Sequence, residues 1–296
     1  ELDSELENDV RNYLQELYTL NLRRNQGLRR QAIEAIAVLN KKGIVPMLIK
    51  GAVQLFQPVH EDFGTRIMTD LDMLVPKERI ADAIEALAQI EYQIHKDPNI
   101  NWETHYHAPP MGRPGEYGVI ELHRNAFGKN ADQVLSTAEI WATAEEGITK
   151  GIRFKVPDAT HTVLLGILHS QFTHGYPQRF RLDYKGLHDM VTITGHQKRG
   201  VDWDQIQNRL AVHGLSWALR THMWAAHRLF NLPVQNDIRP SVFTRIYHGL
   251  FMSRIRWAIV DEWFEIFFDS FIVCLRKRFG PLKQLLPLRL VFRKIN

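Results

Sequence analysis

Asp70 and Asp72 lie one residue apart in a short apolar segment that is typical of a buried strand. Because strand side chains alternate between two faces, both aspartates point to one face, while Leu71, Met73 and Val75 point to the core. Two close carboxylates repel each other unless a cation lies between them. Mg²⁺, or Mn²⁺ in its place, is a natural candidate, because it is commonly bound by one or two carboxylates together with substrate phosphates. Replacing either aspartate with Asn should therefore hold or raise the stability of the metal-free protein while abolishing metal-dependent chemistry.

Glu121 supplies a third carboxylate on another predicted strand. Alternation places Ile120 and Leu122 in the core and leaves Glu121 and His123 together on the opposite face. If this strand lies beside the strand of the two aspartates, the three acids form a site for two metal ions. His123 shares that face and is a candidate for contact with the substrate or its phosphates.

Lys50 and Gly51 follow a short apolar run, residues 45–49, and begin a turn that leads through Ala52 into a helix. Such a junction presents backbone N–H groups at a helix N-terminus, where phosphate oxygens bind. Lys50 adds a positive charge there. Arg66 precedes the aspartates, and two roles stay open for it: binding a phosphate, or fixing the loop that leads into the acidic strand.

His188 and Asp189 form another pair of residues that can bind a metal, with His161 and His169 upstream. Their order is similar to the histidine and His-Asp ligands of HD-type phosphohydrolases, which gives a hydrolase as an alternative. Asp189 could also reach across a cleft toward the substrate. The structural alternative for it is a salt bridge to a neighbouring arginine or lysine.

Apolar spacing divides the chain into three zones. Residues 1–42 have helical spacing, and residues 43–156 mix strands with helix. The strands expected in the second zone are residues 45–49, 69–75, 102–108, 117–124 and 152–156, with a helix between residues 76 and 90 and a turn at 109–115. This alternation predicts a mixed α/β sheet.

The third zone, residues 157–296, has no convincing strand pattern. Asp158 can cap a helix that runs to His169. Further helices are expected at residues 182–194, 203–212, 216–230, 241–256 and 257–275. We therefore predict two domains, residues 1–156 with a core at about 43–156, and an α-helical domain at 157–296.

The composition, 45% hydrophobic and 24% charged, is typical of a globular protein. A single cysteine, Cys274, excludes an intramolecular disulfide and fits a reducing cytoplasm, and no apolar run is long enough to cross a bilayer. Residues 276–296 hold seven basic residues and no acid, so the rest has 30 basic and 33 acidic residues. This basic tail favours contact with a membrane surface or a protein partner, or packing on its own domain, whereas a nucleic-acid partner is not expected.

Taken together, Lys50-Gly51, Arg66-x-x-x-Asp70-x-Asp72 and Glu121-x-His123 resemble a family of bacterial nucleotidyltransferases described as uncharacterised, within the DNA polymerase β-like superfamily. The resemblance covers roughly residues 43–124. Two features depart from the superfamily pattern: Ala52 replaces the usual Ser or Gly, and Asp70 follows Gly51 by 19 positions, a longer gap than usual.

The resemblance implies an α+β fold: a nucleotidyltransferase-type mixed α/β core with flanking N-terminal helices and a C-terminal α-helical domain. It implies transfer of NMP from an NTP to a hydroxyl of an unidentified acceptor by two metal ions held by Asp70, Asp72 and Glu121. Lys50, Gly51, Ala52 and Arg66 would then bind the nucleotide's phosphates. A descendant that has lost catalysis and acts as a binding or scaffold protein is the other alternative.

Overall fold

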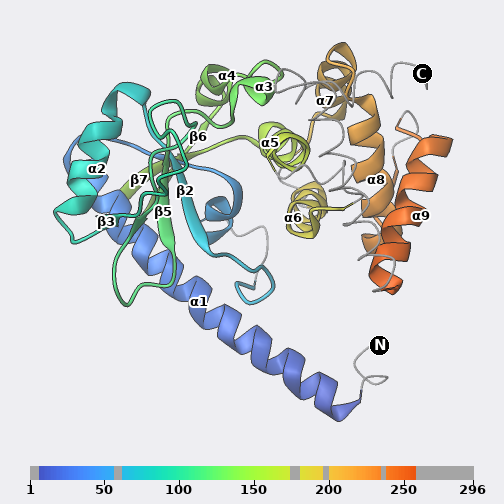
Figure 1. Ribbon diagram of the computed structural model, residues 1–296, viewed down its shortest axis with the longest axis horizontal. Helices are drawn as coiled ribbons and strands as arrows, with labels where there is room; N and C mark the ends of the chain where they lie inside the picture. Colours follow the sequence, from blue (N-terminus) through green and yellow to red (C-terminus); the bar gives the residue numbers. More distant parts are fainter. Residues whose placement is uncertain (1–6, 57–61, 174–180, 196–199, 235–237, 258–296) are drawn as a thin grey trace.

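The computed structural model describes residues 7–56, 62–173, 181–195, 200–234 and 238–257. The helix predicted at residues 257–275 and the basic tail lie outside the described residues, apart from Trp257. Within the described residues, a mixed sheet is combined with helices on both sides (Figure 1). The predicted α+β fold class is confirmed.

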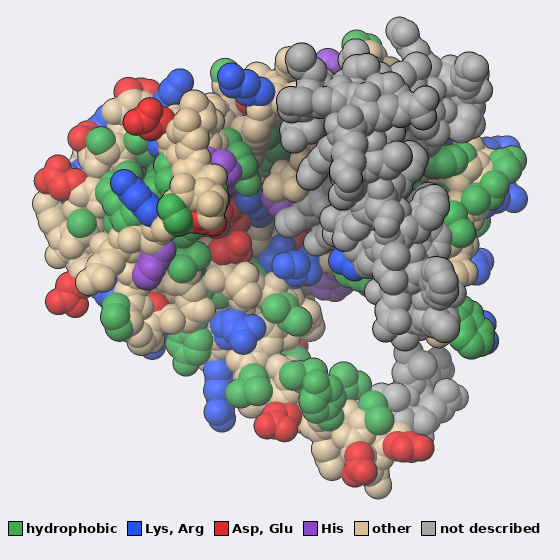
Figure 2. Space-filling view, viewed as in Figure 1, with side chains coloured by type: hydrophobic (Ala, Val, Ile, Leu, Met, Phe, Trp, Pro, Cys, Tyr) green, Lys and Arg blue, Asp and Glu red, His purple; other side chains and the backbone are tan. Residues whose placement is uncertain are grey.

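Helix α1 (Asn8–Lys41) is one continuous helix of 34 residues rather than several leading helices. Gly27 lies inside this helix, and a side chain there has no room, because a Cβ atom would lie 2.1 Å from the Tyr117 ring. Its C-terminal half packs on the sheet, and its N-terminal half extends away from the body (Figure 1). The described apolar residues that predicted the N-terminal half lie exposed along the projecting part, where Figure 2 shows green side chains; they are Val10, Tyr13, Leu14 and Leu17.

The sheet of the described residues has the strand order β3-β4-β5-β2-β1-β7-β6. Its strands are β1 (Met47–Leu48), β2 (Asp70–Leu74), β3 (Gln93–Ile94), β4 (Met111–Gly112), β5 (Val119–His123), β6 (Glu145–Thr149) and β7 (Ile152–Val156). β2 runs parallel to β5 and antiparallel to β1, and β1 runs parallel to β7. The two strands that carry the predicted acids are therefore direct neighbours near the centre of the sheet.

The prediction of a strand at residues 102–108 is wrong. The segment consists of turns and bends with one isolated bridge, between His107 and His123. Its carbonyl groups are taken by a side chain, because the Arg124 guanidinium donates to the carbonyl oxygens of Trp102, His105 and His107. Three strands were not predicted. The edge strands β3 and β6 are largely exposed and lack apolar alternation. The short strand β4 lies inside the segment predicted as a turn, residues 109–115, where its pairing with β3 and β5 gives no local sequence signal.

The two faces of the sheet pack against different helices. On one face, Leu71, Met73, Ile120 and Leu122 join a core cluster with α1 and α2 (Ile80–Ala88). On the other face, Met47, Ile49 and Leu74 join a cluster with the later helices. By strand alternation, the acids of β2 and β5 lie on this second face, toward the helical half of the chain.

Beyond Pro157, the described residues form helices joined by loops and contain no strand, as predicted. Its helices are α5 (Ala159–Phe172), α6 (Tyr184–Gly195), α7 (Trp203–Val212), α8 (Ser216–Phe230) and α9 (Val242–Arg256), after the short α3 (Lys129–Asp132) and α4 (Thr137–Ala142). Asp158 caps α5 by accepting from the His161 backbone N–H, which confirms the predicted cap. None of the described helices combines the length and the apolar character needed to cross a bilayer.

Candidate functional site

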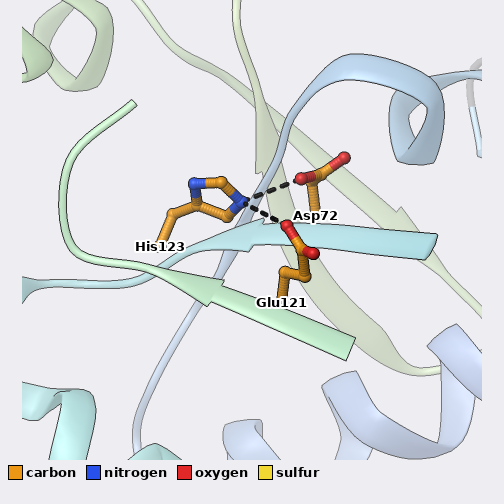
Figure 3. Close-up of side chains that lie close together, drawn as sticks. All are labelled: Asp72, Glu121 and His123. Atoms are coloured by element: carbon orange, nitrogen blue, oxygen red, sulfur yellow. Dashed lines mark hydrogen bonds and ion pairs between the residues drawn. The ribbon is translucent and has the colours of Figure 1, made fainter. Parts of the chain in front are cut away.

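The register between β2 and β5 aligns the predicted acids. Asp72 lies opposite Glu121, and Asp70 lies opposite Val119. Residues paired across neighbouring parallel strands point to the same face, so the carboxylates of Asp72 and Glu121 project side by side (Figure 3). The predicted juxtaposition of the two acidic strands is therefore present.

Asp72, Glu121 and His123 form a cluster whose ligand-type atoms all lie within 4.8 Å of one another (Figure 3). The His123 Nε2 atom lies 2.8 Å from the Asp72 Oδ1 atom and 3.6 Å from the Glu121 Oε2 atom. His123 and Asp72 are buried, and Glu121 is partly exposed. Asp70 is not a member of this cluster, so the three predicted acids do not converge that closely, although Asp70 is near enough to feel the charges of the other two.

Lys50 reaches Asp72 from the neighbouring strand end. The Lys50 Nζ atom lies 2.8 Å from the Asp72 Oδ1 atom. β1 ends just before it, and the backbone N–H of Ile49 donates to the Asp72 carbonyl oxygen. The chain then turns at Lys50, whose φ of 52° lies in the left-handed region that disfavours residues with a side chain. The predicted phosphate-binding lysine thus makes an ion pair with the central acid of the site.

These contacts shift the pKa values of the three acids in different directions. Burial alone would raise the pKa of the Asp72 carboxyl, but Lys50 and His123 lower it well below its usual range. Burial likewise opposes the ionised form of Glu121, but the interactions with His123 and His107 together lower the pKa of Glu121. The pKa of Asp70 is raised, by burial first and then by the negative charges of Asp72 and Glu121.

Arg66 binds Asp189, which lies on α6 in the helical half. The Arg66 Nε atom lies 2.7 Å from Asp189 Oδ1, and its Nη2 atom lies 2.7 Å from Asp189 Oδ2. The predicted turn lies against the same guanidinium, because a Cβ atom on Gly51 would be 2.4 Å from Arg66 Nη1. Asp189 therefore does reach across from the helical half, and its contact there is with Arg66, in the segment that leads into β2.

Ala52 does not line the site. It is fully buried and belongs to the core cluster with α1 and α2. The turn continues as a 3₁₀ helix, η2 (Lys50–Leu55), in which Gly51, Ala52 and the residues that follow are buried. The side chain of Ala52 therefore packs in the core, and only its backbone stays a candidate for phosphate binding.

The positions of His188 and Asp189 do not support the alternative of an HD-type phosphohydrolase. Asp189 is engaged by Arg66, and within the described ranges no group of three metal-ligating side chains includes His188 or Asp189. His161 contacts Asp158 at its helix cap, with 2.6 Å between His161 Nδ1 and Asp158 Oδ2. His161, one of the upstream histidines of that alternative, therefore supports a helix end.

Three residues near the acids were missed by sequence reasoning. Tyr106 lies beside His123, with 5.6 Å between the ring centroids, and its pKa is raised by burial despite the charge of Lys50. The segment that carries Tyr106 is fixed by Arg124, as described above. Lys185, on α6, is close enough to lower the pKa of Asp70. The signal for Tyr106 was present in the histidine and aromatic residues of 102–108, but the segment was assigned to a strand.

The donor set fits a hard divalent cation. The ionised carboxylates of Asp72 and Glu121, on neighbouring strands, share one face with the carboxyl group of Asp70. Their negative charges contribute to the raised pKa of Asp70, and a bound cation would neutralise these charges. Figure 2 shows acidic, basic and histidine side chains close together near the middle of the molecule, beside the atoms drawn in grey. Lys50 offsets part of the negative charge, which leaves a net anionic face.

Comparison with known proteins supports the pattern. A family model described as an uncharacterised nucleotidyltransferase matches residues 1–231, a range that includes every strand of the described sheet and helices α1 to α8. No curated protein sequence matches. Among solved structures, the solution structure of the antibiotic-resistance factor ANT(2'')-Ia is similar, with a TM-score of 0.43 and 12% identity. That match covers 68% of this chain and 98% of the other.

Proposed function

Since the chain belongs to the family of uncharacterised nucleotidyltransferases, we propose that it transfers NMP from an NTP to a hydroxyl of a small molecule, sugar or peptide. The observation that carries this proposal is the pairing of Asp72 with Glu121 on parallel neighbouring strands, with Asp70 on the same face. The face looks toward the helical half, which leaves α6 in a position to border the substrates. The two predicted domains, 1–156 and 157–296, would then form the two walls of the site.

Asp70, Asp72 and Glu121 would hold the cations, Mg²⁺ or Mn²⁺. Bound there, divalent cations neutralise the triphosphate and lower the pKa of the acceptor hydroxyl. The residues of this chain prepare the site for them: Lys50 and His123 keep Asp72 ionised and fixed in position. Metal ligands must be deprotonated, and this arrangement supplies an ionised carboxylate at neutral pH.

In the reaction, the acceptor oxygen forms a bond to the α-phosphorus. The bond from the α-phosphorus to the oxygen that bridges it to the β-phosphorus breaks, and pyrophosphate leaves with that electron pair. Glu121 is the proposed acceptor of the hydroxyl proton, at a carboxylate whose lowered pKa keeps it unprotonated before the step. Positioning and charge neutralisation supply most of the acceleration in transfers of this kind.

The test is a transfer assay with the four α-labelled NTPs, Mg²⁺ or Mn²⁺, and a panel of sugars, polyols and hydroxyl-bearing peptides, with the protein itself included as acceptor. We expect label to appear on one acceptor class and pyrophosphate to be released in equal amount. The Asp70→Asn/Asp72→Asn double variant is the control, and it should be inactive. Equal labelling by the double variant would exclude these acids from the chemistry.

A second function rests on one observation. The Lys50 ammonium already satisfies Asp72 without any metal ion, as it would in a protein that has lost catalysis and only binds. Titration with Mn²⁺ separates the two: a catalytic protein should bind Mn²⁺ more tightly once NTP is present, whereas a scaffold should show no such coupling.

A further inference from the structure

The Arg66–Asp189 contact joins the two halves of the molecule over the predicted phosphate turn. Asp189 takes one edge of the guanidinium, with Nε and Nη2 each 2.7 Å from a different carboxylate oxygen. Both side chains are largely buried, with exposed fractions of 12% and 14%. A two-point carboxylate contact of this kind fixes the plane of an arginine as well as its charge.

The opposite edge of the guanidinium is directed at the turn. A Cβ atom added to Gly51 would lie 2.4 Å from Arg66 Nη1 and 3.2 Å from the Met68 sulfur, so only glycine admits Arg66 so close to the backbone. An arginine held at one edge by a carboxylate presents its remaining N–H groups in a fixed direction. Here that direction is toward the backbone between Lys50 and Ala52.

The backbone of Arg66 is fixed as well, from α1. The side-chain amides of Asn21 and Asn25 donate to the Arg66 carbonyl oxygen at 3.0 and 2.7 Å. The same two amides also bind the carbonyl oxygens of Gly64 and Phe63. Both asparagines are buried, at 6% and 0% exposed, so these hydrogen bonds are shielded from water.

We infer that Asp189 is a positioning residue: it orients Arg66 so that the Nη1 edge, together with the backbone at Gly51, receives the triphosphate of the nucleotide. The inference rests on the proposed function, in which an NTP is the substrate, and the anion is therefore a triphosphate. Asp189 acts through Arg66 and does not itself contact substrate. This revises its predicted role as a substrate-side residue, and it makes α6 part of the nucleotide site.

The first test measures triphosphate binding and folding stability separately for Asp189→Asn. Inorganic tripolyphosphate and each of the four NTPs, with Mg²⁺, are titrated by calorimetry, and unfolding is followed in urea. Loss of an oriented charged hydrogen bond should weaken tripolyphosphate binding by about tenfold or more. Asp189→Glu, which keeps the charge, should recover part of the loss. A lower unfolding midpoint with unchanged binding would mean a purely structural ion pair and would overturn the inference.

Gly51→Ala perturbs the same guanidinium from the other side. Gly51→Ala should weaken triphosphate binding to a similar extent. The double variant with Asp189→Asn should bind triphosphate as tightly as whichever single variant has the lower affinity. Additive losses would show that the two residues act independently, against the inference. Gly166→Ala on α5, where no atom lies within 4 Å of the added carbon, is the matched glycine control. Asp82→Asn, which removes an exposed ion pair of the same 2.7 Å length with Arg79, is the matched charge control.

If Asp189→Asn does not fold, Arg66→Lys provides the same comparison, since lysine keeps the charge and cannot present two fixed edges. It should weaken triphosphate binding while retaining the fold, and unchanged binding would overturn the inference. Failure of the proposed function is distinguishable. If the unaltered protein binds no triphosphate, both conclusions fall; if it binds triphosphate and these variants bind it equally well, only the positioning role falls.

Discussion

Replacing Asp72 with Asn should destabilise the protein, whereas replacing Asp70 with Asn should not. Asp72 is an ionised, buried carboxylate that satisfies the ammonium of Lys50 and a ring nitrogen of His123. The amide keeps an acceptor oxygen but removes the charge, which leaves Lys50, only 20% exposed, without an anion to pair with. Asp70 is in the opposite situation, because burial and its two anionic neighbours oppose its charge.

The magnitude follows from burial. Breaking a fully buried ion pair by removing one partner costs about 3–5 kcal/mol, and partial exposure of Lys50 together with the retained acceptor lowers this to roughly 2–3 kcal/mol. For a chain of this size the corresponding fall in the unfolding midpoint is about 3–5 °C. Asp70→Asn removes a charge whose pKa is raised in the folded state, so the free energy of unfolding should stay the same or rise slightly.

The assay is thermal and urea unfolding at pH 7.5 in the presence of EDTA, so that bound cations do not contribute. Asp72→Asn, Asp70→Asn and the unaltered protein are compared under identical conditions. Equal stabilities for Asp72→Asn and the unaltered protein, or an equal loss in both variants, would refute the assignment of Lys50 to Asp72. The sequence alone predicted a neutral or stabilising effect for both, because Lys50 was assigned to phosphate.

Three further predictions follow from other contacts. Glu121→Gln should cut turnover by about 10²-fold or more in the transfer assay by removing a ligand charge and a proton acceptor, and near-normal turnover would leave Glu121 outside the chemistry. Asn25→Ala should lower the free energy of unfolding in urea by about 2 kcal/mol, since it removes two buried hydrogen bonds to the carbonyl oxygens of Phe63 and Arg66; an unchanged midpoint would contradict this. His161 has a raised pKa, mainly through its hydrogen bond with Asp158, so its contribution to stability is full below pH 6.5 and is lost as the pH rises through the folded-state pKa. His161→Gln should therefore flatten the fall in stability above pH 6.5, and an unchanged pH profile would argue against the protonated pair.

Elements with a strong local signal were predictable. Helices α7 and α8 begin and end at the residues predicted, and β7 does as well. Each has a clear apolar period, and the cap at Asp158 depends on adjacent residues only. The face shared by Asp72 and Glu121 was predictable for the same reason, because strand alternation is local and the core residues mark the buried side.

Features that depend on distant contacts were not predictable. The apolar spacing in the first part of α1 indicated a helix, but it did not reveal that no other described residue covers these side chains enough to bury them. The alternation in 102–108 was mistaken for a strand because Arg124 binds its carbonyl groups from a position beyond the segment. The partner of Asp189 lies 123 residues away, and only the folded chain brings it to Arg66.

The position of bound metal tests the central claim most directly. Crystals grown with Mn²⁺ and a non-hydrolysable NTP analogue should show an anomalous diffraction peak bound by the carboxylates of Asp72 and Glu121, with Asp70 on the same ion or its neighbour and the triphosphate beside it. Mn²⁺ and triphosphate bound away from these carboxylates, or a site at saturating concentrations in which Lys50 remains paired to Asp72 with no metal, would contradict a metal-dependent nucleotidyltransferase.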